Sequence, residues 1–145
     1  MSQIIVKMFV YPEELLEMQA IRRSVFQEEQ GVDPQLEFDG LDKAAIHLLA
    51  YLDNRPVGTA RVRYLNEQVA KIERLAVLST ARGLGIGKKL MQEAIEVAKQ
   101  NNVQEVVIHA QEYVKGLHQQ LEFKQIGEIF EEAGIPHVKM TRKLK

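Results

Sequence analysis

The segment that decides the fold is Arg82-Gly83-Leu84-Gly85-Ile86-Gly87. It lies between an expected strand that ends near Leu78 and the stretch from Gly85 to Gln100, in which apolar residues recur at helical spacing. Such a junction presents unpaired backbone N–H groups at a helix N-terminus, where the helix dipole favours an anion. Glycines allow a ligand to approach the backbone closely. The segment therefore predicts a diphosphate site.

Two better-known phosphate loops do not match this segment. A P-loop requires Gly-x-x-x-x-Gly-Lys-[Ser/Thr], but Arg82 occupies the first glycine position and Lys89 the Ser/Thr position. A dinucleotide fingerprint, Gly-x-Gly-x-x-Gly, fails from either possible starting glycine because Lys88 or Leu90 stands at its last position. The pattern that remains is Arg-x-x-Gly-x-Gly, formed by Arg82, Gly85 and Gly87.

The periodicities on either side of this segment predict one α/β domain, residues 1–145. Strands are expected at Ile4 to Val10, Ile46 to Leu52, Val57 to Tyr64, Ala70 to Leu78, Val103 to Ala110, Phe123 to Phe130 and His137 to Met140. Helices are expected from Pro12 to near Gly31, from Gly85 to Gln100 and from Glu112 to Leu121, with a loop from Asp33 to Asp42. This order is not the regular alternation of a doubly wound sheet. It predicts a mixed sheet with helices on both faces.

Composition excludes several classes of protein. The chain has no cysteine, which excludes disulfides, thiolate zinc sites and cysteine nucleophiles. Its 19 Lys and Arg against 20 Asp and Glu argue against generic nucleic-acid binding. No apolar run approaches the roughly 18 residues of a membrane span, and the stretch from Met1 to Lys7 lacks the features of a signal peptide. We expect a cytoplasmic protein with no metal site and no nucleic-acid or membrane partner.

The pattern Arg82-x-x-Gly85-x-Gly87 resembles the cofactor motif of the GNAT superfamily, [Arg/Gln]-x-x-Gly-x-[Gly/Ala]. Four further segments resemble its ElaA/YjcF branch: Ile21 to Val32, Pro56 to Arg61, His109-Ala110-Gln111 and Gly134 to Met140. The resemblance implies a mixed, mostly antiparallel central sheet and acetyl-CoA (coenzyme A) as co-substrate. It also implies that the pantetheine arm lies along Leu75, Ala76 and Val77. The phosphates would be held by Arg82, Gly83, Leu84, Gly85, Ile86, Gly87 and Lys88.

Amine attack on a thioester requires a proton acceptor, because alkyl amines with a pKa near ~10 are mostly protonated at pH 7. Glu73 is the first candidate for this base, since it precedes the expected pantetheine segment and is expected on the same side of its strand as Leu75. The alternative is a surface carboxylate paired with Lys71 or Arg63. Other acids are either rival bases or parts of a solvated loop: Glu29, Asp39 and Asp42.

The family's usual leaving-group acid is a tyrosine in the segment Phe-Tyr-x-x-Leu-Gly-[Phe/Tyr]. The matching stretch here is Leu117 to Phe123, in which His118 stands at the tyrosine position and Glu122 replaces the glycine. Histidine can donate a proton near neutrality, so His118 is a candidate acid and predicts a bell-shaped pH–rate profile. Tyr113 is the alternative acid, and a structural role for both is the third possibility.

The sequence therefore predicts an N-acetyltransferase that transfers acetyl to a small-molecule or peptide amine by direct attack. Two alternatives stay open. One is an acyltransferase similar to acyl-homoserine-lactone synthases, and the other is a non-catalytic acyl-CoA-binding domain, which the missing tyrosine leaves open. The acidic loop suggests a cationic acceptor, whereas Arg61 or Arg63 suits an anionic one. The acceptor therefore stays open, as does a homodimer.

Overall fold

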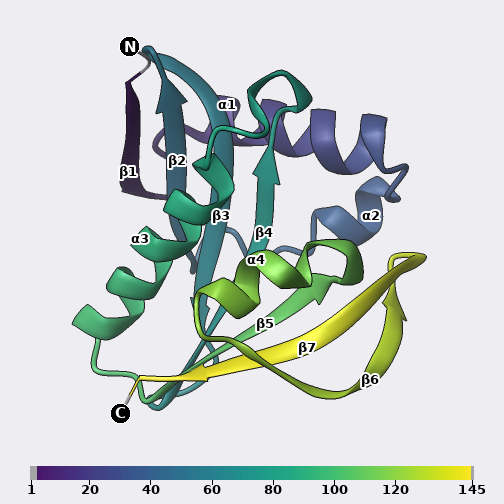
Figure 1. The fold of residues 1–145 in the computed structure, drawn as a ribbon. Helices are drawn as coiled ribbons and strands as arrows, with labels where there is room; N and C mark the ends of the chain where they lie inside the picture. Colours follow the sequence, from purple (N-terminus) through teal and green to yellow (C-terminus); the bar gives the residue numbers. More distant parts are fainter. Residues whose placement is uncertain (1–2, 145) are drawn as a thin grey trace.

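The computed structural model describes residues 3–144 and contains a seven-stranded sheet with helices on both faces (Figure 1). The strands are β1 (Ile4–Val10), β2 (Ile46–Leu52), β3 (Arg55–Tyr64), β4 (Val69–Val77), β5 (Glu105–Gln111), β6 (Lys124–Glu132) and β7 (Ile135–Lys143). Their order is β1-β2-β3-β4-β5-β7-β6. The β4–β5 pair is parallel, and the other neighbouring pairs are antiparallel. The predicted mixed, mostly antiparallel sheet is confirmed.

The helical segments are α1 (Leu15–Arg22), η1 (Arg23–Glu29), α2 (Pro34–Glu37), η2 (Ser79–Ala81), α3 (Ile86–Gln100), η3 (Glu112–Val114) and α4 (Lys115–Gln120). Helices α3 and α4 cover one face of the sheet, and α1, η1 and α2 cover the other (Figure 1). Within residues 3–144, no helix is long and apolar enough to cross a membrane.

Three local predictions differ from the structure. The first helix begins at Leu15 rather than at Pro12, because Glu14 before it adopts a left-handed φ of 50°, and its second half is the π-helix η1. The stretch predicted as a loop contains α2, whose first turn is capped by the side chain of Asp33. The β2–β3 turn is shorter than expected, because Asp53 and Asn54 both have positive φ and close it in two residues.

Helix α3 packs its apolar stripe against the centre of the sheet, and Leu90 and Ala94 are fully buried there. Gly58 on β3 allows this close approach, since a Cβ at that position would lie 3.0 Å from Cδ1 of Leu90. The contact fixes the N-terminal part of α3 beside the end of β4, where the glycine-rich segment lies.

Strand β4 carries a bulge at Arg74, whose φ is 56°. In the β3–β4 register, Arg61 pairs with Glu73 and Thr59 pairs with Ala76. Strand β4 therefore has one residue more than β3 between these two pairs.

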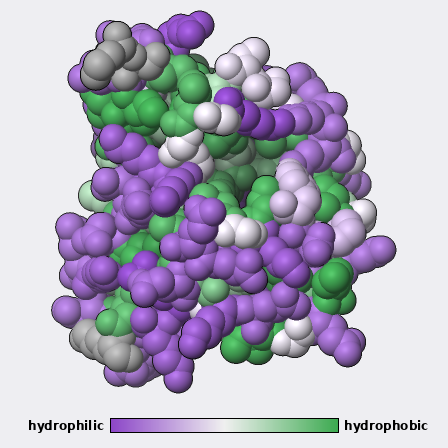
Figure 2. Space-filling model, in the orientation of Figure 1, coloured by the Kyte–Doolittle hydropathy of each residue, from purple (hydrophilic) through white to green (hydrophobic). Residues whose placement is uncertain are grey.

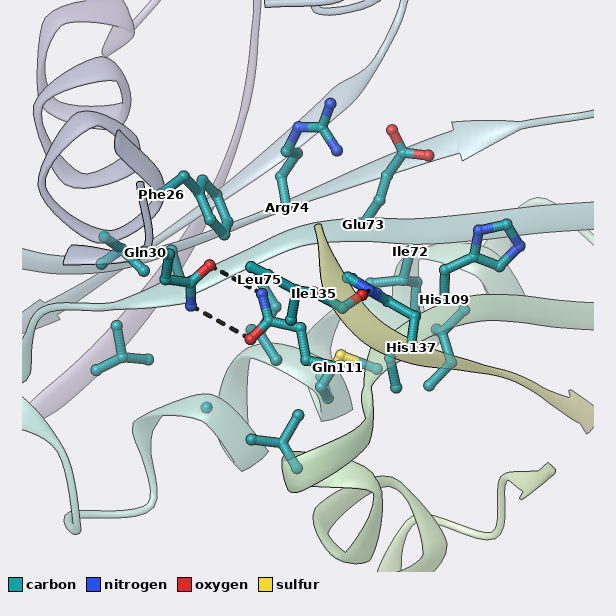
Figure 3. Close-up of a pocket in the computed structure, with 18 of the residues that line it drawn as sticks. Phe26, Gln30, Ile72, Glu73, Arg74, Leu75, His109, Gln111, Ile135 and His137 are labelled. Atoms are coloured by element: carbon teal, nitrogen blue, oxygen red, sulfur yellow. Dashed lines mark hydrogen bonds between the residues drawn. The ribbon is translucent and has the colours of Figure 1, made fainter. Parts of the chain in front are cut away.

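The bulge reverses the side-chain alternation along β4 and corrects the expectation that Glu73 and Leu75 share a side. Leu75 and Val77 pack against the core cluster that faces α3, whereas Ala76 belongs to the cluster that faces α1. Glu73 shares the face of Ala76, because these two residues pair with residues two apart on β3. Figure 3 shows Glu73 and Leu75 extending in opposite directions from the strand.

Strands β4 and β5 are paired only over their first halves, Val69–Ile72 with Glu105–Ile108. Beyond these residues the strands diverge (Figure 1). The β5-facing edge of β4 is therefore not in register with a neighbouring strand from Glu73 to Val77.

Candidate functional site

A cleft of about 670 Å³ opens where β4 and β5 diverge. It is visible as a hollow with apolar surface inside it (Figure 2). Its walls come from β4, β5, η1, the glycine-rich segment and α4. The site can therefore accept a long ligand that has an apolar or amide-bearing arm between two polar ends.

One end of the cleft is the glycine-rich segment before α3. Gly83 and Gly85 have φ of 80° and 81°, values that glycine adopts without strain, and an added Cβ at either would meet no atom within 4 Å. The backbone N–H of Lys89 donates to the Gly85 carbonyl at 3.1 Å. The three preceding N–H groups therefore have no partner within the helix. This open turn fits a diphosphate.

Arg82 lies beside this turn and is tied to both sides of it. Its Nε donates to the carbonyl of Val77 at 3.0 Å, at the end of β4. Its two Nη atoms each donate to the carboxylate of Glu29 at 2.5 Å. These hydrogen bonds lower the pKa of Glu29 below its ordinary value. Glu29 thus binds the guanidinium of Arg82, which was expected to bind phosphate.

The structure brings most of the expected cofactor-binding residues to the cleft. Those that line it are Leu75, Ala76, Val77, Arg82, Gly83, Gly85, Ile86 and Gly87. Leu84 and Lys88 are not among the residues that line it, and their expected part in phosphate binding stays a prediction. Both side chains are exposed, and the backbone N–H of Lys88 is the part of that residue left near the turn.

Two glutamines close the middle of the cleft over Leu75 (Figure 3). The Gln30 amide donates to Oε1 of Gln111 at 3.2 Å, and the Gln111 amide donates to Oε1 of Gln30 at 2.9 Å. Gln30 follows η1 and Gln111 ends β5, so this pair joins the two sides of the opening. The exposed Tyr113 places its hydroxyl 3.5 Å from the same Gln30 amide.

Glu73 lies at the other end of the cleft, on the face covered by α1. Its carboxylate pairs with Arg61, with Arg63 at 3.0 Å and with Lys71 at 3.6 Å. Its side chain is 9% exposed. Three cationic side chains therefore surround this carboxylate.

The acidic loop is ion-paired rather than solvated. Asp42 pairs with Arg22 at 2.8 Å and with Arg61 at 3.0 Å, and Asp39 pairs with Arg61 at 2.8 Å. Burial opposes ionisation of Asp39, but hydrogen bonds from Arg61 and a backbone N–H outweigh it and lower its pKa. Arg22 and Glu37 form a further ion pair of 2.8 Å in which each side chain is 1% exposed. This network fixes the loop behind Glu73.

His118 lines the α3-side wall of the cleft and is 3% exposed. Burial lowers its pKa from 6.5 to about 4. Its ring meets Phe123 edge-on at 6.0 Å, and its buried Nδ1 has no hydrogen-bond partner among the described residues. At pH 7 the ring is therefore neutral, which gives no basis for the expected bell-shaped profile.

His109, Glu132 and His137 meet beside the point where β4 and β5 part. Nδ1 of His109 lies 3.0 Å from Oε1 of Glu132, and Nε2 of His137 lies 3.8 Å from Oε2 of the same carboxylate. All three residues line the cleft. Sequence reasoning placed the two histidines in apolar strands but missed Glu132. This residue lies on β6, and the sequence gives no register between β6 and the strands of the two histidines.

Residues 14–144 match the model of the acetyltransferase (GNAT) domain. The chain belongs to the GNAT acetyltransferase family. Among curated relatives, the uncharacterised protein YyaT of Bacillus subtilis is 38% identical over 134 residues, which cover 90% of each chain.

Solved structures of GNAT proteins agree with this assignment. The crystal structure of Escherichia coli ElaA has a TM-score of 0.85 and 26% identity, and the match covers 97% of this chain and 99% of ElaA. The predicted resemblance to the ElaA/YjcF branch is thereby confirmed. A GNAT family acetyltransferase from Elizabethkingia anophelis, solved with acetyl-CoA bound, shares the fold at a TM-score of 0.74 and 19% identity, with 97% and 98% of the two chains covered.

Proposed function

We propose that this GNAT protein transfers acetyl from acetyl-CoA to an amine by direct attack on the thioester. The proposal rests on two adjoining parts of the cleft, the unpaired edge of β4 and the glycine-rich turn. The unpaired edge of β4 from Glu73 to Val77 leads directly to the open glycine turn at the N-terminus of α3. An amide-bearing arm can pair with the first, and a diphosphate fits the second.

Each part of the co-substrate then has a place. The diphosphate is held by the N–H groups from Ile86 to Lys88 and by Arg82, after Glu29 has released its guanidinium. The pantetheine arm lies along Leu75, Ala76 and Val77, with the Gln30–Gln111 pair over it. The thioester then lies toward the polar end of the cleft, beside Glu73 and the two histidines.

Three side chains that line the cleft are candidates for proton transfer: Glu73, Tyr113 and His118. Glu73 is the base that the sequence suggested, but its carboxylate is held by three cationic partners. Tyr113 is the proposed donor to the departing thiolate, because its phenol is exposed and lines the cleft. His118, neutral at pH 7, is a weaker donor from its ring N–H.

The test is an acetylation screen with acetyl-CoA and a panel of primary amines: amino acids, polyamines, amino sugars and short peptides. Release of the CoA thiol is followed with a thiol-reactive dye, and the chain itself contributes no thiol because it has no cysteine. The acetylated amine is then identified by mass spectrometry. The proposal predicts equimolar release of CoA and formation of an N-acetyl product.

The two alternatives give different outcomes in the same screen. Turnover with longer acyl donors and not with acetyl-CoA would favour the acyl-homoserine-lactone synthase-like reading. Tight binding of acetyl-CoA without acetylation of any amine would favour a non-catalytic binding domain. Either result overturns the proposed reaction, whereas the family assignment stands on the sequence match.

A further inference from the structure

We propose that His109 is the general base of this site and that Glu132 positions it. The inference rests on the proposed acetyl transfer, because it names the group that receives the proton of the acceptor amine. It starts from the contact between His109 Nδ1 and Glu132 Oε1, 3.0 Å apart.

The contact fixes where the imidazole carries its proton. An ionised carboxylate only accepts hydrogen bonds, so in the neutral ring Nδ1 is the donor and Nε2 keeps a free lone pair. The lone pair of Nε2 is then the one that can take a proton. The ring is also held edge-on against Phe130, with centroids 5.2 Å apart.

His137 contributes to the same arrangement from β7. Its Nδ1 donates to the carbonyl of Ile135 at 2.6 Å, which fixes this ring as well. Its side chain is 8% exposed, whereas that of His109 is 28% exposed. Of the two histidines beside Glu132, His109 is therefore the one open to a ligand in the cleft.

His109 also lies where the acceptor has to arrive. Lys71 and Val107 pair in the β4–β5 register, and Glu73 and His109 each follow two residues later on the same face. They are thus neighbours on the two strands just where these part, as Figure 3 shows. Glu73 is surrounded by three cations, whereas the Nδ1 of His109 faces a carboxylate. The electrostatics favour His109 over Glu73 as proton acceptor.

The charged and titratable groups around His109 come from three strands. They are Lys71 and Glu73 on β4, Glu132 on β6, and His137 and Lys139 on β7. Across residues 3–144 no three His, Asp or Glu side chains are arranged to hold a metal ion.

The acceptor ammonium gives one proton to Nε2 of His109, and the freed lone pair of nitrogen forms a bond to the thioester carbonyl carbon. The C–S bond breaks with its electron pair on sulfur, the thiolate takes the phenol proton of Tyr113, and the second proton of the nitrogen restores the phenol. His109 then returns its proton to solvent.

The experiment compares His109→Gln and Glu132→Gln with the matched control Glu131→Gln, an exposed neighbour on β6 without an ion pair among the described residues. The probe is the amine with the highest rate in the panel, assayed from about pH 6 to 9. His109→Gln should lower kcat about 10²-fold or more and remove the acid limb of the profile. Glu132→Gln should lower kcat about tenfold and shift that limb, and Glu131→Gln should match the wild type.

Binding of acetyl-CoA, measured by titration calorimetry, should change by less than about twofold in all three variants. A His109→Gln enzyme that keeps its kcat within about threefold, or keeps the acid limb, overturns the assignment. A second readout needs no acceptor: long-range ¹H–¹⁵N spectra of the imidazoles should show His109 as the Nδ1–H tautomer, and Glu132→Gln should weaken this preference. If the wild type acetylates no amine, the proposed function fails. If the Nδ1–H tautomer is absent, the His109–Glu132 assignment fails by itself.

Discussion

Arg82 and Glu29 face each other at the mouth of the cleft, with both Nη atoms of the guanidinium 2.5 Å from carboxylate oxygens. Arg82 is also the residue proposed to meet the diphosphate. Glu29 therefore competes with the co-substrate for the same donors, and its displacement is part of binding. Both side chains are about two-fifths exposed, so the competing pair is a weak one.

Glu29→Gln should strengthen the binding of acetyl-CoA by about two- to fivefold, because the competing charge is removed. The matched control is Glu28→Gln, an exposed neighbour without an ion pair among residues 3–144, which should leave the dissociation constant unchanged. Titration calorimetry checks both. Weaker binding in Glu29→Gln would mean that the carboxylate orients Arg82 for the ligand rather than blocking it.

His118 should make the protein less stable in mild acid. Its folded-state pKa of about 4 lies below the ordinary value of 6.5, because burial disfavours the charged ring. Between these two pH values the unfolded chain binds a proton that the folded chain does not, so the free energy of unfolding falls as the pH falls. The loss is at most about 3 kcal/mol and is complete near pH 4.

Urea unfolding at pH 7 and at pH 5 tests this for the wild type and His118→Leu. The variant should lose less stability between the two pH values than the wild type does. It keeps the contribution of His47, whose pKa is also lowered, chiefly by burial. An equal loss in both proteins would show that His118 is not the buried, neutral group described above.

Gly58→Ala should destabilise the protein by about 1 to 3 kcal/mol. The new Cβ would lie 3.0 Å from Leu90 and 3.2 Å from Ile86 on α3, and 3.3 Å from the Ala76 carbonyl on β4. Because α3 carries the phosphate turn at its N-terminus, a shift of this helix should also weaken acetyl-CoA binding. Gly116→Ala in α4 meets no atom within 4 Å and serves as the control, with unchanged or slightly higher stability. Unchanged unfolding in Gly58→Ala would disprove the close packing of α3 on β3.

The sequence alone predicted the strand-turn-helix at Gly85 because both of its signals are local. Helical spacing from Ile86 to Gln100 and glycines with positive φ need no knowledge of distant residues. The seven strands followed from short apolar runs bounded by turn residues. Their mostly antiparallel pairing was implied only by the family resemblance, and their order in the sheet was not predicted.

The bulge on β4 could not be read from the sequence. Arginine rarely adopts a positive φ, so Arg74 gives no sign of a bulge in the sequence. Without the bulge, Glu73 and Leu75 would lie on the same face of a regular strand. One extra residue against β3 places these side chains on opposite faces. The prediction that Glu73 lies on the same side of the strand as Leu75 was wrong for this reason.

The ion pairs of the acidic loop were missed for a similar reason. Asp42 and Glu37 look like solvated charges because their partner, Arg22, is 20 and 15 residues away in the chain and on another element. A buried arginine that appears in the sequence within an amphipathic helix gives no local sign of its partners. The same holds for Glu132 and His109, which are 23 residues apart.

Titration of acetyl-CoA into Gly85→Glu tests the proposed co-substrate site most directly. The matched control is Gly127→Glu on β6, because Gly127 has a similar φ of 79° and equally open surroundings, and lies outside the cleft. Both variants therefore carry the same charge and the same backbone strain. We predict that Gly127→Glu binds acetyl-CoA like the wild type and that folded Gly85→Glu, verified by circular dichroism, shows no binding. Wild-type affinity in folded Gly85→Glu would contradict the placement of the diphosphate at the N-terminus of α3.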